Sequence, residues 1–183
     1  TNKGTFLKFK PSLLRVLNRD WQFDPSNLVS LQDGAITFNN LRVANEGQSL
    51  GLQGKISPNP EETLELEIKD VSLDLLNTFS TVDVEGTADG QFQVASLQDQ
   101  ATLAGSLHVE GLGINDFPIG EIDLSAAMEA GDLRLNLENY FNGQKKIDID
   151  GTVNLDSRNL EFDAKLTEAN LVIFEPFLSN YIS

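Results

Sequence analysis

The feature that most constrains this chain is a strict alternation of apolar and polar residues, repeated in run after run. In the clearest run, Leu64, Leu66 and Ile68 alternate with charged residues. Four further runs show the same alternation, at 122–129, 133–138, 147–155 and 160–165. Successive side chains of a strand point to opposite faces, so each run predicts a strand with one dry and one wet face. The pattern indicates an all-β chain with an antiparallel sheet solvated on one side.

Short turn sequences separate the runs. Glycine-containing pairs typical of tight turns occur at 33–34, 89–90, 130–131 and 142–143. Longer polar or proline-containing loops are predicted at 57–60, 115–118 and 156–159. The stretches that favour helix are short, at 12–18, 73–79 and 171–177. We therefore expect one or two short helices at most.

Glycines fall within or beside several predicted strands. They are Gly86, Gly90, Gly105, Gly111, Gly113, Gly120 and Gly151. Glycine in a strand commonly marks a bend, a bulge or a close approach of another chain segment. A sheet with so many of them is expected to curve strongly.

An internal repeat of nearly a hundred residues is the second strong signal. Residues 48–56 match residues 145–153, with Gly54 in register with Gly151, and residues 73–79 match residues 171–177. We expect repeat-like units at about 36–79 and 133–177, joined by hairpins over 80–132, within one β-repeat domain spanning 1–183. Because the second unit stops partway and the first residue is not methionine, we expect an excerpt of a longer array.

Charge and cysteine content exclude several classes of protein. The chain carries 28 acidic and 13 basic residues, a net charge of -15, so it is expected to repel nucleic acid. The absence of cysteine excludes disulfide-stapled domains and thiol catalysis. No apolar run approaches the roughly 18 residues that a membrane-spanning helix needs.

No motif predicts catalysis, and we expect a protein that is not an enzyme and needs no cofactor. Residues 51–56 lack the spacing of a phosphate-binding loop, and no nucleophile elbow is present. His108, the one histidine, is expected at the surface. Asp148 and Asp150 lack the spacing of a calcium loop. Trp21 is expected to anchor the first strand to the core.

One family shares the order of these features. The apolar segment 73–79, then 84–92 with Gly86 and Gly90, then Leu103-Ala104-Gly105-Ser106-Leu107, then 117–122, resembles the TamB family and its AsmA-like relatives. The resemblance covers most of the chain from Trp21 onward. It implies a curved, taco-like β-sheet with an apolar interior and no catalytic residues.

The resemblance also implies a place and a role. Such proteins lie in the periplasm of Gram-negative bacteria, anchored in the inner membrane. They are linked to phospholipid movement between the membranes and to outer-membrane protein assembly beside a BamA-related barrel. We expect the dry strand faces to line a groove for phospholipid acyl chains. The groove-lining residues proposed are Leu66, Leu107, Leu135, Ile149 and Phe162.

Strand alternation alone leaves other structures and functions open. Two dry faces could cover each other in a closed sandwich, as in an adhesin or sugar-binding module. The chain could instead act as an interaction scaffold that pairs its sheet edges with barrel strands. The resemblance favours the groove.

Overall fold

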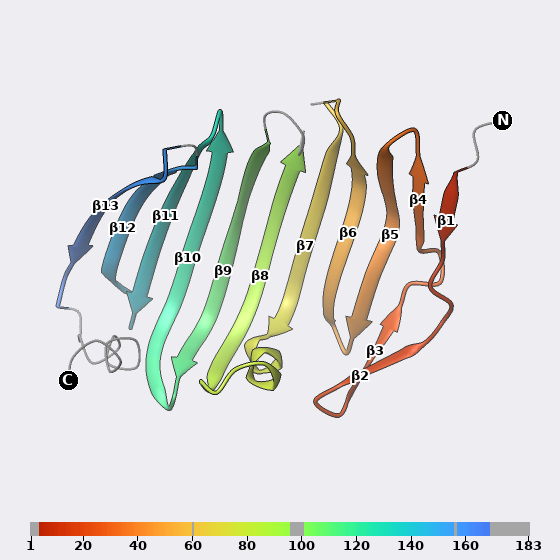
Figure 1. Ribbon diagram of the computed structural model, residues 1–183. Coiled ribbons are helices and arrows are strands. Elements are labelled where there is room, and N and C mark those ends of the chain that lie inside the picture. Colours follow the sequence, from red (N-terminus) through yellow and green to blue (C-terminus); the bar gives the residue numbers. More distant parts are fainter. Residues whose placement is uncertain (1–3, 60, 96–100, 156, 169–183) are drawn as a thin grey trace.

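The computed structural model describes residues 4–59, 61–95, 101–155 and 157–168, and most of them are in β-strands. The strands form a single 13-stranded sheet in the order β1-β4-β5-β6-β7-β8-β9-β10-β11-β12-β13, with the β2–β3 hairpin attached to β5 through β3 (Figure 1). Every pairing is antiparallel, and the sheet does not close into a barrel. The predicted all-β, antiparallel fold is confirmed, as one sheet rather than two facing each other.

The strands are β1 (Thr5–Leu7), β2 (Leu13–Val16), β3 (Arg19–Phe23), β4 (Leu28–Gln32), β5 (Ala35–Asn45), β6 (Gln48–Ile56), β7 (Thr63–Ser72), β8 (Val84–Ala95), β9 (Thr102–Ile114), β10 (Phe117–Glu129), β11 (Asp132–Phe141), β12 (Gln144–Asn154) and β13 (Asn159–Leu166). A short 3-10 helix, η1 (Leu73–Thr78), follows β7 and confirms the helix predicted at 73–79. No helix in the described part of the chain has the length and apolar character needed to cross a membrane.

Two local predictions are wrong. Residues 89–90 do not turn but lie inside β8, because Gly90 faces Leu107 across the strands and leaves room for that side chain. Residues 12–18 are not helical, because β2 pairs with β3, with Leu14 opposite Trp21. Pairing with a neighbouring strand outweighs a weak local preference. The helix predicted at 171–177 lies outside the described residues.

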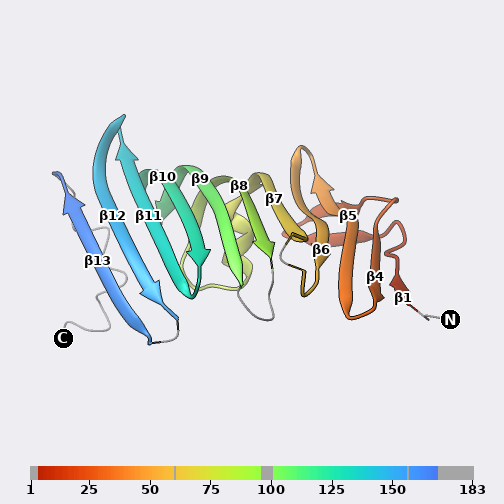
Figure 2. The same ribbon diagram turned by 90° about the horizontal axis from the view of Figure 1, so that it is seen from above.

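The sheet is strongly curved, as expected from its glycines. Register shifts interrupt β7, β8 and β10 near the same end of the sheet. Left-handed backbone conformations occur there at Asp70, Gly86, Gly111 and Gly120. Such bulges bend a strand and increase its twist. Figures 1 and 2 show β8, β9 and β10 bending along their length.

Gly120 is a bulge position with almost no room for a side chain. Its φ is +101°, and a Cβ atom built there would stand 2.2 Å from the carbonyl oxygen of Tyr140. Asn139 supports the same bulge, since its Nδ2 donates to the carbonyl oxygens of Ile119 and Glu121 at 2.9 and 3.1 Å. Asn139 is only 3% exposed, so its amide needs these partners.

Four well-buried apolar residues form a band at this bulged end. Val71, Ala88 and Val109 are cross-strand partners, and Ile147 follows further along the same row. At this end of the sheet the helix η1 contacts β8, the strand that carries Ala88. We call these four residues the buried band.

The β2–β3 hairpin and η1 meet beside this end of the sheet. Both terminal nitrogens of Arg19 in β3 donate to the Asp74 carboxylate of η1, at 2.8 and 2.6 Å. Trp21 is 3% exposed, in agreement with its predicted anchoring role. The ion pair therefore fixes a segment near the start of the chain to one that is 55 residues away.

The predicted repeat of nearly a hundred residues is not confirmed. The two glycines placed in register differ in conformation: Gly54 has a φ of +112°, whereas Gly151 is absent from the left-handed region. Residues 169–177 of the second unit lie outside the described residues.

Candidate functional site

All five residues predicted to line a groove lie on one face of the sheet. Leu66, Leu135 and Phe162 belong to a single cross-strand row. Leu107 and Ile149 belong to the next row, connected through Leu124 and Leu137. The strand parity deduced from the sequence therefore agrees with the observed register. That lipid contacts these residues remains a prediction.

The cross-strand register places further apolar side chains on this face, from β6 to β13. The side chains that share it, here called the apolar face, are Leu50, Leu52, Leu64, Leu66, Ile68, Phe92, Val94, Leu103, Leu107, Leu124, Met128, Leu133, Leu135, Leu137, Ile149, Val153, Leu160, Phe162 and Leu166. Strands lie about 4.8 Å apart, so the face from β6 to β13 is roughly 35 Å wide.

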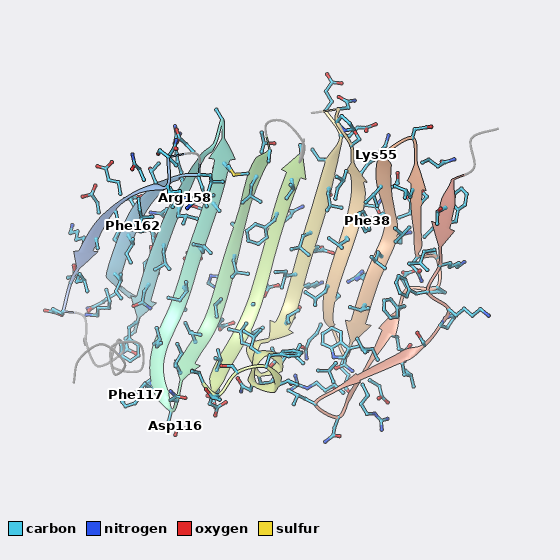
Figure 3. All side chains as sticks on the ribbon, viewed as in Figure 1. Phe38, Lys55, Asp116, Phe117, Arg158 and Phe162 are labelled. Carbon is cyan, nitrogen blue, oxygen red and sulfur yellow. The ribbon has the colours of Figure 1, made fainter. Side chains whose placement is uncertain are left out.

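Much of the apolar face beyond the buried band remains accessible. Leu66, Leu107, Leu135 and Ile149 are half-buried, and Phe162 is 49% exposed. These are large apolar side chains, and the described strands provide no second sheet to cover them. Figure 3 shows Phe38 and Phe162 over well-separated parts of the sheet.

Glycines on the apolar face make room for phenylalanine rings. Phe92 lies opposite Gly105, and Phe162 lies opposite Gly151. A Cβ atom at either glycine would stand about 2 Å from the ring, at 2.2 and 2.1 Å respectively. An aromatic ring laid over a cross-strand glycine covers backbone that would otherwise be exposed. At Gly105 the backbone oxygen of Gln91 is also close, at 2.6 Å from such a Cβ, so the predicted close backbone approach is confirmed there.

The opposite face, here called the polar face, carries charge in cross-strand rows. One row runs Asp89, His108, Asp123, Glu138 and Asp148, with Lys165 at its end. Lys145 bridges Glu138 and Asp148 and moderates their repulsion. The hydrogen bond to Glu138 raises the pKa of Lys145 and keeps it charged.

His108 lies on the polar face, with a side chain 46% exposed, as predicted. Its Nδ1 is 2.7 Å from an Asp123 carboxylate oxygen. That hydrogen bond raises the pKa of His108; the charges of Asp123, Glu121 and Glu110 act in the same direction, and partial burial opposes them. His108 therefore favours its charged form more than an isolated histidine does.

The polar face also holds a hollow that the sequence did not predict. It measures about 450 Å³ and lies over β10–β13. Arg134, Asn136, Asp150, Thr152 and Asp163 are among its lining residues. Small residues such as Ser125 and Ala127 stand between longer charged ones there, so the hollow follows from side-chain length on a twisted sheet. The larger accessible apolar surface lies on the other face, and we base the functional argument on that.

Metal chemistry has no support in the described residues. No group of three or more histidine, cysteine or acidic side chains gathers there to hold an ion. Asp148 contacts Lys145, and Asp150 accepts from Asn136 at 3.0 Å. The carboxylates of Asp148 and Asp150, which lack calcium-loop spacing, thus each contact another side chain.

Fold and site together define an open, single-sheet antiparallel β-protein with one apolar and one charged face. Comparison with known proteins gave no match to a family model, a curated protein or a solved structure.

Proposed function

We propose that this chain is a non-catalytic conduit for phospholipid acyl chains, which move along the apolar face of the sheet. The observation that carries the proposal is an accessible apolar face that continues across at least eight strands, from β6 to β13. Exposed apolar surface of this extent on a soluble domain usually marks an interaction site.

The dimensions suit an acyl chain. Apolar residues continue from Ile122 to Met128 in β10, about 20 Å at roughly 3.4 Å per residue. One leaflet of a bilayer is about 15 Å of hydrocarbon, half of the core thickness. A single strand therefore offers enough apolar length for one acyl chain, while the headgroup stays in water.

The lining suits movement rather than specific recognition. Its side chains are mainly leucine, isoleucine, valine and phenylalanine, which bind through apolar area and do not distinguish headgroups. Neighbouring rows offer similar surface, so a bound chain loses little free energy when it shifts from one row to the next.

The TamB-like resemblance extends the proposal to place and partners. It favours the periplasm of a Gram-negative bacterium, a parent protein anchored in the inner membrane, and a BamA-related barrel as a partner of that parent. The conduit would then carry phospholipid between the two membranes.

Site-specific photo-crosslinking tests the proposal. A benzophenone amino acid is placed at Leu66, Ile149 or Phe162, and in matched variants at the neighbouring Glu65, Asp148 or Glu161. After irradiation in Gram-negative cells that export the chain, mass spectrometry identifies the adducts. We expect phospholipid adducts at the first set only. Adducts to the protein itself without lipid, or equal lipid adducts at both sets, would refute the proposal.

Charge insertion gives a second test. Leu107→Arg or Ile149→Arg should lower lipid adducts about tenfold, since the loss of one leucine-sized contact removes about 1.5 kcal/mol or more. The matched changes Ser106→Arg and Asp148→Arg lie on the polar face and should leave the yield unchanged. Equal losses in both pairs would indicate general destabilisation.

A further inference from the structure

The last of the described strands, β13, has the properties of a pairing surface. Among the described strands, β13 pairs with β12 alone, so its other backbone edge has no strand partner there. All eight of its residues are exposed, including Leu160 at 61%, Phe162 at 49% and Leu166 at 47%. A sheet edge of this kind is a template for pairing with another strand.

The usual protections of an edge strand are weak in β13. It contains no proline, and its register with β12 has no bulge. The opposite edge strand, β1, is only three residues long. Short edges, proline, bulges and charge are the devices that blunt strand edges, and β13 retains only charge. The charged side chains of β13 therefore determine which strand can pair with its free edge.

We propose that β13 pairs antiparallel with β13 of a second copy of this chain, around a two-fold axis at Ala164. The apolar faces of the two copies must lie on the same side of the joined sheet. Odd-numbered residues of β13 therefore pair with odd-numbered residues of the second copy, and even-numbered residues with even-numbered ones. In this register Lys165 faces Asp163 of the second copy, and Phe162 faces Leu166. Each contact occurs twice, because a two-fold interface is self-complementary.

The charges favour this register over those with a nearby axis. An axis at Lys165 would place the two Lys165 side chains opposite each other. An axis at Phe162 would place Glu161 opposite Asp163, with like charges in contact. An axis at Asp163 would pair Glu161 with Lys165, but it would also place the two Asp163 carboxylates together, each already opposite Asp150 of its own β12, and so align four carboxylates. With the axis at Ala164, each Asp163 faces Lys165 of the other copy in place of a second Asp163. Opposite charges directly across strands stabilise pairing and like charges oppose it.

The apolar face continues through the proposed interface. Phe162 and Leu166 are on that face, and each is about half exposed in the isolated chain. Pairing across the axis places Phe162 opposite Leu166 of the second copy and joins two sheets into one with a shared, still accessible apolar face. A single strand pair is a small interface, so we expect a reversible dimer whose population rises with concentration.

Sedimentation velocity of the full chain over a range of concentrations tests the association. We expect a species at twice the 20.1 kDa monomer mass. Lys165→Glu should weaken association about tenfold or more, since two favourable pairs become unfavourable. Lys69→Glu, the same change on the polar face of β7, should not. Adding Asp163→Lys to Lys165→Glu exchanges the charges and should restore the dimer.

A single introduced cysteine tests the register, because the chain has none of its own. Residues facing each other in an antiparallel pair have Cα atoms about 4.5–5.5 Å apart, within the span of a disulfide. Ala164→Cys should therefore form a disulfide dimer on mild oxidation, whereas Phe162→Cys should not, since its copies are offset by four residues. A monomer at every concentration, a dimer indifferent to Lys165→Glu, or efficient crosslinking through Asp163→Cys in place of Ala164→Cys would overturn the proposal.

Discussion

The two phenylalanine–glycine pairs give a quantitative test of how the apolar face is packed. Alanine at Gly105 would bring its Cβ to 2.2 Å from the Phe92 ring and to 2.6 Å from the carbonyl oxygen of Gln91. Alanine at Gly151 would meet only the Phe162 ring, at 2.1 Å, among neighbours closer than 3 Å. The first clash involves backbone, whereas the second involves one side chain that is 49% exposed and can turn outward.

The expected costs differ accordingly. Replacing glycine by alanine in extended backbone stabilises a protein by about 0.4–1 kcal/mol through the unfolded state. Overpacking a well-filled site costs about 1–3 kcal/mol. We expect Gly105→Ala to lower the free energy of unfolding by about 1–2 kcal/mol. Gly151→Ala should change it by less than about 0.5 kcal/mol.

Urea unfolding followed by Trp21 fluorescence measures both variants, because Trp21 is the single tryptophan and is buried. Phe92→Leu in the Gly105→Ala background should recover only part of the loss, since the contact with the Gln91 carbonyl remains. Equal costs for the two glycines, or a larger cost at Gly151, would show that backbone contacts do not control the packing of this face.

Two further predictions concern the polar face and the bulge. The pKa of His108 is raised by its hydrogen bond to Asp123, so this pair stabilises the fold below the unfolded-state pKa of about 6.5, and the contribution is lost as pH rises through the folded-state pKa. NMR titration should place the pKa above 6.5, and Asp123→Asn should lower it; an unchanged pKa would contradict the assignment. Gly120→Ala should cost about 2 kcal/mol or more, because it combines a left-handed φ with contact to the Tyr140 carbonyl. Gly143→Ala, with a φ of +70° and open space around it, serves as the matched control and should cost about 1–2 kcal/mol in denaturant unfolding.

Alternation made the faces of the sheet predictable. Because side chains in a strand have a period of two, Leu66, Leu135 and Ile149 could be assigned to one face before any pairing was known. The tight turns at 33–34 and 142–143 were equally predictable, since left-handed conformations at Asp33, Gly34, Asn142 and Gly143 match the two-residue hairpin.

Features that depend on pairing could not be predicted in the same way. Residues 89–90 have turn-like composition, and only the register shows that Gly90 accommodates Leu107. Asn139 looks like any polar residue in its strand, yet it holds the Gly120 bulge from the apolar side. The β2 strand forms because β3 is available to it. Each outcome is decided by a partner distant in sequence.

Stability and the proposed lipid contact depend on different parts of one apolar face. Val71, Ala88, Val109 and Ile147 are at most 7% exposed, at the bulged end of the sheet where η1 contacts β8. Leu66, Leu107 and Leu135 lie one or more rows away and remain partly exposed. Burial contributes to folding in proportion to the area removed from water. The buried band therefore contributes nearly all of its apolar area to folding, whereas the outer rows retain apolar area that a ligand can still cover. A single-layer sheet can thus bury part of its apolar face at the end that carries the bulges near Gly86, Gly111 and Gly120, and leave the rest of that face accessible to a ligand.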